Sequence, residues 1–229
     1  MKKKLAMMWS GGKDSSLALY TLLQSEEFEV VRLVSTFSAE TERLSMHGIP
    51  QDIVDQQAKS IGLPLTKMFI DQSTHSAYEE AMLKLLNELK LEDINDVAFG
   101  DIFLEDLRKY REENLAKLNV TAHFPLWKQE TTQLINEFIE LGFKTICCCT
   151  DSSKLDNRFL GQIIDKEWIR KLPSNVDVCG ENGEFHTICI DGPFFDMPLV
   201  LDIKGIVVKE YFHNNTVFKY EFANLLLKY

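Results

Sequence analysis

The sequence predicts an α/β fold: a doubly wound, mainly parallel, Rossmann-like sheet with a smaller α+β part at the C-terminal end. Over the first 150 residues, short apolar runs alternate with amphipathic stretches of helical spacing, as in successive βαβ units. After about Thr150, short helical pieces come first and β-rich runs follow. We therefore expect one domain over residues 1–150 and a second over residues 151–229.

The elements of the first part follow from local patterns. The apolar run from Leu5 to Trp9 ends in Ser-Gly-Gly, which is typical of a buried strand that leads into a turn. A helix over 51–61 is expected to stop at Gly62 and Pro64. The other expected strands cover 30–34, 65–70, 97–100, 120–124 and 143–149, and the other expected helices cover 14–24, 77–91, 104–118 and 132–141.

The C-terminal part has a different pattern. A Gly-rich segment over 179–183 precedes β-rich runs at 187–190, 199–212 and 216–222. The last two runs flank His213-Asn214-Asn215, which is typical of a hairpin turn. This part is therefore expected to hold an antiparallel hairpin.

Composition and charge exclude several classes of protein. The chain has 229 residues, of which 45% are hydrophobic and 26% charged, values typical of a globular fold. With 25 basic and 35 acidic residues the net charge is −10. This charge argues against nucleic acid and membrane surfaces as partners, because those need basic patches. A small anionic ligand is still compatible, since a phosphate pocket needs only local positive potential.

The cysteines and the N-terminus indicate a cytoplasmic location. The number of cysteines is five, and three of them, Cys147 to Cys149, are adjacent, so an ordinary disulfide framework is not expected. No Cys-x-x-Cys pair is present for a zinc ribbon. The apolar run after the basic N-terminus is too short for a signal peptide, and no run of about 18 apolar residues could span a membrane.

The most informative stretch is Ser10-Gly11-Gly12-Lys13-Asp14-Ser15, which we call the phosphate loop. It follows a strand and begins a helix, so bare N–H groups and the positive end of the helix dipole point at the same place. Lys13 adds a full positive charge, while Ser10 and Ser15 add hydroxyl donors. Asp14 either caps the helix or helps to hold Mg²⁺ against phosphate oxygens.

The phosphate loop matches neither of two common nucleotide motifs. A Walker A motif has four residues between its glycines and then Gly-Lys-Ser/Thr, and the dinucleotide fingerprint is Gly-x-Gly-x-x-Gly. Neither pattern occurs here. The alternative for the hexapeptide is a plain strand-to-helix turn with a capping aspartate, which its position at the first βα turn disfavours.

Two more loops are expected at the same edge of the sheet. His47 lies between the second strand and the second helix, and Gly100 and Asp101 end a later strand. Ligands bind outside the carboxyl ends of the strands in such sheets. His47 is therefore a candidate ligand-binding residue rather than a surface histidine. Asp101 is a candidate metal or ribose partner, or else the N-cap of the next helix.

Aromatic and sulfur-bearing residues give further candidates. Trp127 follows the strand-breaking Pro125, and its indole either lines a purine pocket or fills the core. The run Cys147 to Cys149 lies in an apolar strand, so we expect it to pack and not to catalyse.

The segment Cys179-Gly180-Glu181-Asn182-Gly183-Glu184, here the Cys-Gly-Glu segment, places two carboxylates, one thiol and two glycines within six residues. Its glycines suggest a close approach of the backbone to a ligand. Glu181 or Glu184 could bind ammonium or act as a general base, although solvated loop glutamates are the alternative. Cys179 and Gly180 are assigned to the lining of the pocket, without covalent catalysis.

Several motifs in order resemble a known family. Ser10 to Ser15 resembles the PP-loop of the N-type ATP pyrophosphatases. Together with it, Ser45-Met46-His47-Gly48-Ile49-Pro50, Gly100-Asp101-Ile102, Pro125-Leu126-Trp127, Cys179 to Phe185 and Asp191-Gly192-Pro193-Phe194 resemble the diphthine–ammonia ligase family, also described as adenine nucleotide alpha hydrolase-like. The resemblance covers nearly the whole chain.

The resemblance implies an ATP-dependent ligase that forms a C–N bond. ATP would be cleaved to AMP and pyrophosphate, with Mg²⁺ as cofactor, and ammonia would displace AMP from an adenylated carboxylate. It implies catalytic roles for Lys13, Asp14, Glu181 and Glu184. The implied ATP-binding residues are Ser10, Gly11, Gly12, Lys13, Asp14, Ser15, His47, Gly100 and Asp101, with Asp14 also at the metal.

The implied acceptor site has matches and departures. Arg108 and Glu112 match the family, whereas Asp106 and Leu107 stand where its members carry Tyr-Gln, and His186 stands where they tend to carry Glu. The expected substrate-binding residues are Arg108, Glu112, Trp127, Cys179, Gly180 and His186. The departures leave the ATP chemistry intact and bear on the acceptor.

The expected acceptor is diphthine, a modified histidine on elongation factor 2. Two alternatives stay open: a PP-loop ligase acting on another small substrate, and a nucleotide sensor that binds ATP or AMP without turnover. An RNA-modifying member is disfavoured by the acidic charge and by the absence of a cysteine pair. Whether the chain forms a homodimer is not fixed by the sequence.

Overall fold

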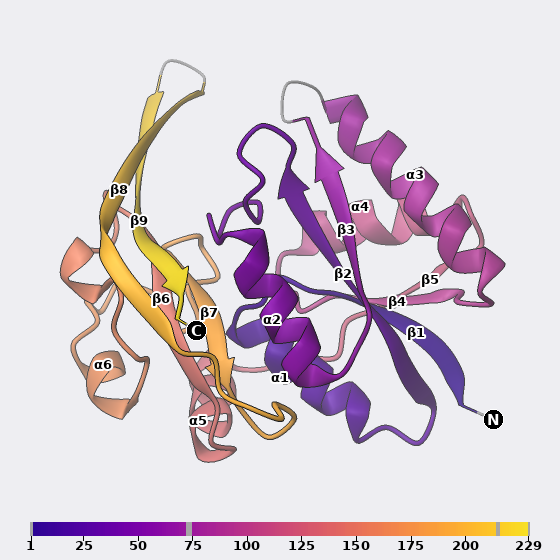
Figure 1. Ribbon diagram of the computed structural model, residues 1–229, viewed down its shortest axis with the longest axis horizontal. Helices are drawn as coiled ribbons and strands as arrows, with labels where there is room; N and C mark the ends of the chain where they lie inside the picture. Colours follow the sequence, from indigo (N-terminus) through magenta and orange to yellow (C-terminus); the bar gives the residue numbers. More distant parts are fainter. Residues whose placement is uncertain (1, 72–74, 214–215, 229) are drawn as a thin grey trace.

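The fold of the first part is a five-stranded parallel sheet in the order β3-β2-β1-β4-β5. The computed structural model describes residues 2–71, 75–213 and 216–228 (Figure 1). The strands are β1 (Lys3–Met8), β2 (Phe28–Ser38), β3 (Leu65–Ile70), β4 (Asp96–Ala98) and β5 (Thr121–His123). All neighbouring pairs are parallel, as the βαβ alternation predicts.

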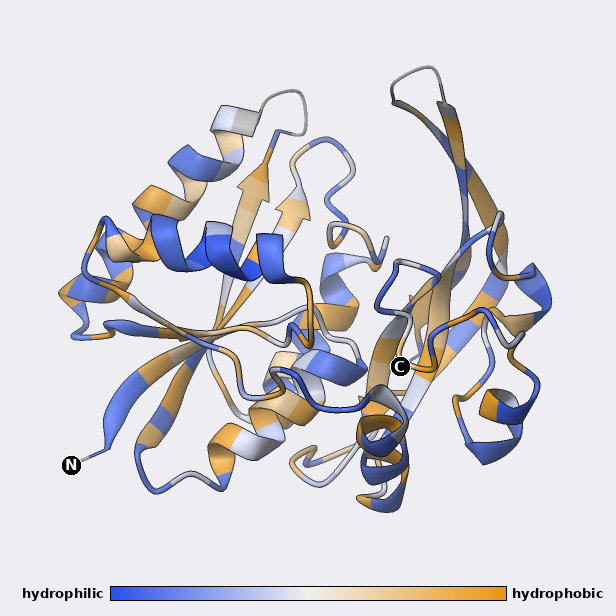
Figure 2. Cartoon of the chain, turned by 180° about the vertical axis from the view of Figure 1, so that it is seen from behind, coloured by the Kyte–Doolittle hydropathy of each residue, from blue (hydrophilic) through white to orange (hydrophobic). Residues whose placement is uncertain are grey.

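Helices cover both faces of this sheet, which confirms the doubly wound fold. They are α1 (Lys13–Leu23), α2 (Gln51–Ile61), α3 (His75–Leu91) and α4 (Glu105–Ala116). Leu85 and Leu86 of α3 and Leu115 of α4 share one apolar core, and Leu17 of α1 and Ile53 of α2 belong to another. Figure 2 shows apolar residues along the strands and polar residues on the outer sides of the helices.

The second part is built on a four-stranded antiparallel sheet in the order β7-β6-β9-β8. Its strands are β6 (Lys144–Asp151), β7 (Phe185–Asp191), β8 (Leu201–His213) and β9 (Thr216–Leu227). The helical pieces are α5 (Thr131–Glu140), the 3₁₀ turn η1 (Asn157–Phe159) and α6 (Lys166–Arg170). Strands β8 and β9 pair antiparallel as expected, while the predicted turn residues Asn214 and Asn215 lie outside the described residues.

One predicted strand joins a different sheet. The run 143–149 forms β6, but β6 pairs antiparallel with β7 and β9 and does not extend the parallel sheet. Residues Thr145 to Asp151 of β6 are all buried, because it is a central strand with neighbours on both sides. A buried strand after a helix has the same local pattern in either kind of sheet, and the partners that decide its place come later in the chain.

The two parts share an apolar core. The core that covers the outer face of α1 and α2 continues into Cys147, Cys148 and Cys149 and into Ile188 of β7. All three cysteines are fully buried and free, as the packing interpretation predicts. The domain boundary near residue 150 stays a prediction. Among the described residues, no helix is long and apolar enough to cross a membrane.

Candidate active site

A cleft of about 840 Å³ lies between the carboxyl ends of the parallel strands and the second sheet. Strand order reverses between β1 and β4, the position where ligands bind in open α/β sheets. The predicted site residues that line the cleft are Ser10, Lys13, Asp14, Ser15, His47, Gly100, Asp101, Cys179, Gly180, Glu181 and His186. The structure thus brings together most of the residues that the sequence singled out.

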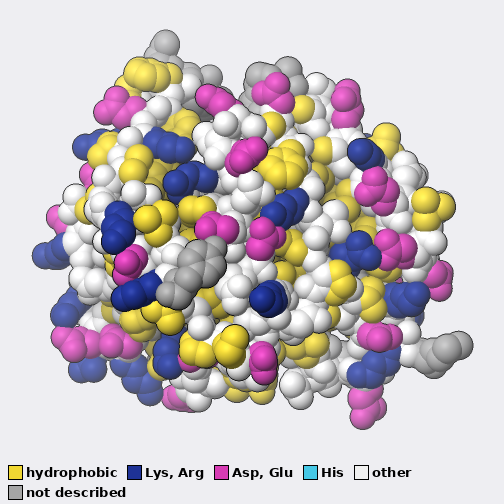
Figure 3. Space-filling model, viewed as in Figure 1, with side chains coloured by type: hydrophobic (Ala, Val, Ile, Leu, Met, Phe, Trp, Pro, Cys, Tyr) yellow, Lys and Arg dark blue, Asp and Glu magenta, His cyan; other side chains and the backbone are white. Residues whose placement is uncertain are grey.

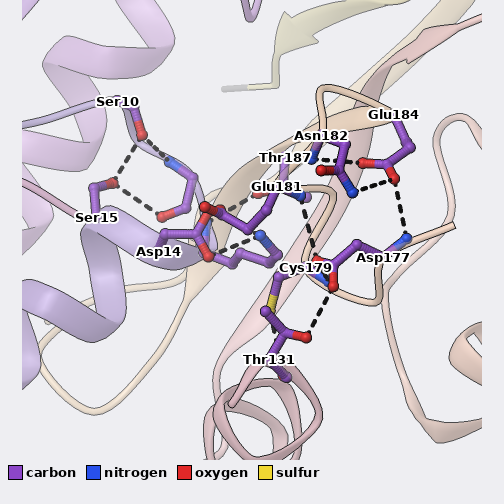
Figure 4. A network of polar contacts seen from close by, with 12 residues as sticks. Ser10, Asp14, Ser15, Thr131, Asp177, Cys179, Glu181, Asn182, Glu184 and Thr187 are labelled. Atoms are coloured by element: carbon purple, nitrogen blue, oxygen red, sulfur yellow. Dashed lines mark hydrogen bonds and ion pairs between the residues drawn. The ribbon is translucent and has the colours of Figure 1, made fainter. Parts of the chain in front are cut away.

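The phosphate loop turns sharply into α1. Gly11 has φ 72°, a left-handed conformation that favours glycine, and Gly12 is the N-cap of α1 with no side chain to cap the helix. Ser10 donates to Ser15 Oγ at 3.1 Å, and Ser15 donates to the Gly12 carbonyl at 3.0 Å (Figure 4). The N-terminus of α1 therefore opens on the cleft with hydroxyl groups beside it, an arrangement suited to an anion.

The second sheet holds the phosphate loop from behind. The Lys13 N–H donates to Thr187 Oγ1 at 2.9 Å, and the Cys189 N–H donates to the Gly11 carbonyl at 2.7 Å. A Cβ on Gly12 would lie 2.9 Å from the Thr187 carbonyl oxygen. Gln57 of α2 donates to the Gly11 and Cys189 carbonyls at 3.0 and 2.6 Å. The loop is thus fixed by β7 and α2, and the sequence pattern gave no signal for Gln57 or Thr187.

Gly100 lets the end of β4 approach the start of α1. A Cβ on Gly100 would lie 3.0 Å from both the Asp14 carbonyl carbon and the Ser15 nitrogen, which are backbone atoms that cannot rotate away. This close approach gives a physical reason for glycine at that position.

We expect Gly100→Ala to push the phosphate loop out of place. Overpacking of this kind costs about 1–3 kcal/mol of stability and should weaken AMP binding, measured by thermal unfolding and calorimetry. Gly62→Ala is the control, because Gly62 has φ 78° and an added Cβ meets nothing within 4 Å. The control should lose stability through backbone strain and bind AMP normally. Normal AMP affinity in Gly100→Ala would contradict the role assigned to this contact.

Lys13 is a buried cation paired with the Asp14 carboxylate. Its ammonium lies 2.7 and 2.8 Å from the two Asp14 oxygens, and the residue is 3% exposed. Burial alone would lower the pKa of Lys13, but the nearby Asp14 and Glu181 carboxylates outweigh it and raise the pKa above its ordinary value. Lys13 is therefore fully charged at neutral pH and adds a positive charge to the lining of the cleft.

Glu181 has a pKa close to neutral pH. Burial, followed by the negative charge of Asp14, raises the pKa of the Glu181 carboxyl from 4.5 to about 8. A carboxyl that titrates near neutral pH can accept and release a proton under physiological conditions. Glu181 lies in electrostatic reach of Lys13 and Asp14, so the Cys-Gly-Glu segment faces the phosphate loop directly (Figure 4).

Glu184 has a different position from Glu181. It is 2% exposed, and its carboxylate accepts the backbone N–H groups of Asp177 and Asn182 at 3.1 and 2.9 Å. It is not among the residues that line the cleft. Its contacts hold the Cys-Gly-Glu segment in shape. The catalytic assignment of Glu184 stays a prediction that the geometry does not favour.

Cys179 and Gly180 line the cleft beside Glu181. The Cys179 thiol donates to the Thr131 carbonyl at 3.4 Å, and burial raises its pKa well above the ordinary range. A neutral thiol is a weak nucleophile, which agrees with a lining role. Gly180 has φ 72°, and an added Cβ would lie 2.8 Å from the Phe185 carbonyl oxygen, so the turn requires glycine.

His47 and His186 form a pair of neutral imidazoles. Their ring centroids are 4.8 Å apart, and the His47 Nδ1 lies 3.2 Å from the Ser45 carbonyl oxygen. Burial lowers the pKa of His47 to about 4 and that of His186 well below its usual value. The His186 Nε2 is buried with no hydrogen-bond partner among the described residues. The pair therefore adds polar groups to the cleft without adding charge.

Arg108, Glu112 and Trp127 lie outside the cleft lining. Arg108 bonds Glu112 at 2.7 Å, and its guanidinium carbon lies 4.6 Å from the Trp127 ring centroid. The cleft is lined instead by Leu104, the N-cap of α4, and by Leu107 and Arg111 on another side of the helix. The substrate-binding assignment of Arg108, Glu112 and Trp127 stays a prediction. Their contacts with one another and with Phe124 explain their positions without a ligand.

Arg111 is a cleft residue that the sequence did not reveal. Its Nη1 donates to Asp101 at 2.6 Å, and its guanidinium carbon lies 4.2 Å from the Phe99 ring centroid. Burial raises the pKa of Asp101, while Arg111 opposes that shift. Among the described residues, the lining of the cleft contains one lysine, Lys13, and one arginine, Arg111. Arg111 lies three residues after the predicted Arg108, and no sequence pattern distinguishes it as a cleft residue.

The carboxylates of the cleft fit a magnesium ion that arrives with a phosphate ligand. In the described part of the chain, no three His, Cys, Asp or Glu side chains converge on a point that could hold a metal. Mg²⁺ is usually held by one or two carboxylates together with phosphates and water. Asp14, beside the phosphate loop, provides one such carboxylate.

Comparisons with known proteins follow the same two parts. Residues 3–121 match the family model of the diphthamide synthase N-terminal domain, and residues 130–224 match that of the C-terminal domain. The chain is 26% identical to the diphthine–ammonia ligase of Homo sapiens and 29% identical to that of Mus musculus. Each match covers 90% of this chain and 85% of the relative.

A yeast relative is longer. The diphthine–ammonia ligase of Saccharomyces cerevisiae is 26% identical over 84% of this chain, which spans 33% of the yeast protein's length.

Proposed function

The chain belongs to the diphthamide synthase family, and from this premise we propose that it is an ATP-dependent ligase that joins ammonia to the carboxylate of diphthine on elongation factor 2. The observation that carries the proposal is the cleft in which the phosphate loop and Glu181 face each other from the two parts of the chain. It offers an anion site beside a carboxyl that titrates near neutral pH.

The first half-reaction forms an adenylate. A carboxylate oxygen of the acceptor attacks the α-phosphorus of ATP, the bond to the β-phosphate oxygen breaks, and pyrophosphate leaves. Negative charge grows on the leaving pyrophosphate. The positive N-terminal end of the α1 dipole, the hydroxyls of Ser10 and Ser15 and the Lys13 ammonium neutralise that charge. Arg111, which also lines the cleft, adds a second cation.

A magnesium ion would be held by Asp14 together with the phosphate oxygens, and it would supply further neutralisation of the leaving group. Lys13, which pairs with Asp14 at 2.7 Å, would bind the phosphate oxygens beside it. Chelation of magnesium is expected to stop adenylation while the chain stays folded.

The second half-reaction forms the amide. Ammonia attacks the acyl carbon of the adenylate, the bond to the AMP oxygen breaks, and the nitrogen loses one proton. We assign the acceptance of this proton to Glu181, which lines the cleft and whose pKa of about 8 keeps both its protonated and its ionised form populated at neutral pH.

The nucleotide products test the proposal. With diphthine-bearing elongation factor 2, ammonium and Mg-ATP, we expect AMP and pyrophosphate in equal amounts, together with one amide per AMP. Chromatography of the nucleotides and mass spectrometry of the acceptor measure these. ADP and phosphate as the main products would contradict the assignment to this chemistry, and AMP release without an acceptor requirement would contradict the ligase.

A second candidate is a ligase of the same chemistry with another carboxylate acceptor. Leu107 and His186, two of the positions at which the chain departs from the family pattern, line the cleft. This supports a changed acceptor contact with an unchanged ATP site. AMP formation with a small carboxylic acid, and none with diphthine-bearing elongation factor 2, would favour this candidate.

A further inference from the structure

The first N–H group of α1 is capped by a residue from the second part of the chain. The N-cap residue, Gly12, has no side chain that could do this. Instead, the Lys13 N–H donates to the hydroxyl oxygen of Thr187 in β7 at 2.9 Å (Figure 4). A Cβ on Gly12 would lie 2.9 Å from the same oxygen. The Thr187 hydroxyl therefore occupies the space that the side chain of an ordinary N-cap residue would fill.

The Thr187 hydroxyl still has a hydrogen to donate. A hydroxyl group has one hydrogen and two acceptor lone pairs, and the Lys13 N–H uses only a lone pair. Among the residues that the structure describes, no oxygen atom accepts that hydrogen. Thr187 is 3% exposed, yet it lines the cleft. A group that enters the cleft can therefore pair with a donor that the folded chain leaves without an acceptor.

The surroundings of Thr187 favour a negatively charged acceptor. The N–H that it accepts lies at the positive end of the α1 dipole, and this contact polarises the hydroxyl and makes it a stronger donor. The charged Lys13 ammonium lines the same cleft. Acidic side chains lie among the basic ones across the face shown in Figure 3. Attraction for a phosphate therefore comes from local donors inside the cleft rather than from this surface.

We propose that Thr187 donates its hydroxyl hydrogen to an oxygen of the pyrophosphate portion of ATP. The inference rests on the proposed function, because it adds a residue of the second part to the groups that hold the leaving group. The Lys13 N–H, the Thr187 hydroxyl and the phosphate oxygen would form a continuous chain of hydrogen bonds. No proton is transferred along this chain. The last bond strengthens as negative charge grows on the leaving pyrophosphate.

Inorganic pyrophosphate is the probe, with its affinity measured by calorimetry. Thr187→Val keeps the shape of the side chain and removes the hydroxyl, so it should weaken pyrophosphate binding by about 10- to 100-fold. Thr187→Ser keeps the hydroxyl and should bind pyrophosphate like the wild type. Adenosine, which has no phosphate, should bind all three proteins equally. Wild-type affinity for pyrophosphate in Thr187→Val would overturn the inference, as would no binding by the wild type.

Thr145→Val is the matched control, because it is the same substitution in the same sheet. Thr145 lies in β6 with no exposed surface, and its hydroxyl oxygen has no hydrogen-bond partner among the described residues. It is not among the residues that line the cleft. The control should bind pyrophosphate like the wild type. An equal loss of affinity in Thr145→Val would overturn the inference, because it would assign the loss to the second sheet as a whole.

The shape of the phosphate loop needs a separate measurement, because Thr187→Val also removes the acceptor of the Lys13 N–H. The backbone amide resonances of Gly11 and Ser15 report on the two sides of the loop. In the ligand-free Thr187→Val protein they should keep their wild-type positions while pyrophosphate affinity falls. A fall in affinity together with displaced Gly11 and Ser15 resonances would overturn the inference, because a changed loop would then explain it.

The two proposals fail in different ways. Amide formation by a wild type whose pyrophosphate affinity is the same as that of Thr187→Val would remove the role of Thr187 and leave the ligase intact. Pyrophosphate binding that depends on the Thr187 hydroxyl, in a wild type that makes no amide, would support the role of Thr187 and remove the ligase assignment.

Discussion

Lys13→Ala is expected to lower the rate of pyrophosphate release by about 1,000-fold or more. Removal of one preorganised donor from a charged transition state costs about 100- to 1,000-fold. Here the loss is larger, because the ammonium also offsets the Asp14 carboxylate, 2.7 Å away. Without it, that carboxylate would repel the leaving pyrophosphate. Affinity should fall strongly for pyrophosphate and ATP and little for adenosine, as measured by calorimetry.

A matched control and a shape-conserving variant separate charge from folding. Lys67→Ala removes a lysine that also pairs with a carboxylate, that of Asp55 at 2.6 Å, outside the cleft. It should leave turnover unchanged. Lys13→Met keeps the buried apolar stem, so it should fold like the wild type and lose turnover like Lys13→Ala. Equal ATP affinity in the wild type and both Lys13 variants would refute the phosphate-loop assignment.

Local patterns predicted most of the first sheet. The helix over 51–61 and the strand over 65–70 have the predicted bounds, because Gly62 and Pro64 break the chain between two strongly patterned runs. Membership of a sheet was not predictable for β6. Its apolar pattern says that it is buried, whereas its partners β7 and β9 lie farther along the chain.

The candidate site was predictable where many polar groups are concentrated in a short motif. Ser10 to Ser15 carry glycines, a cation and hydroxyls at one turn, and that density is visible in the sequence. Thr187 was not predictable, since it contacts Lys13 across 174 positions of sequence. Within its own strand, Thr187 has no feature that distinguishes it from other strand residues. Its contact with Lys13 depends on how the two parts of the chain pack together.

The two glutamates of the Cys-Gly-Glu segment show what a loop sequence leaves open. Glu181 and Glu184 are chemically identical and three residues apart. Gly180 and Gly183 have φ 72° and 75° and turn the segment. As a result, Glu181 lines the cleft, whereas Glu184 is buried and does not line it. The direction of each side chain depends on this backbone path, which composition does not encode.

Glu181→Gln is expected to spare adenylation and to slow amide formation by about 100- to 10,000-fold, the usual contribution of a general base. In the wild type, only the ionised carboxylate can accept the proton. At a fixed concentration of free ammonia, amide formation should therefore rise with pH and level off above about 8, the pKa to which burial and then Asp14 raise Glu181. The variant should lose this inflection. Trapping of the acyl-adenylate with hydroxylamine measures the first step, and ammonia-dependent turnover measures the second.

The same pKa makes a separate statement about stability. The folded chain binds a proton at Glu181 more tightly than the unfolded chain does. This contribution to the free energy of unfolding is thus complete below about pH 4.5 and is lost as pH rises through about 8. Glu181→Gln should remove that part of the pH dependence, which urea unfolding at several pH values will detect.

Glu184→Gln is the matched control for Glu181→Gln, with the same substitution three residues away. The Glu184 carboxylate accepts backbone N–H groups from Asp177 and Asn182, so an amide nitrogen in its place would face a donor. We expect a loss of about 1–3 kcal/mol in stability and no change in the pH inflection of amide formation. If Glu181→Gln amidates at the wild-type rate with the wild-type pH profile, Glu181 is not the base. If it loses ATP binding instead, Glu181 serves the nucleotide half of the cleft, and its proximity to Lys13 is then the reason.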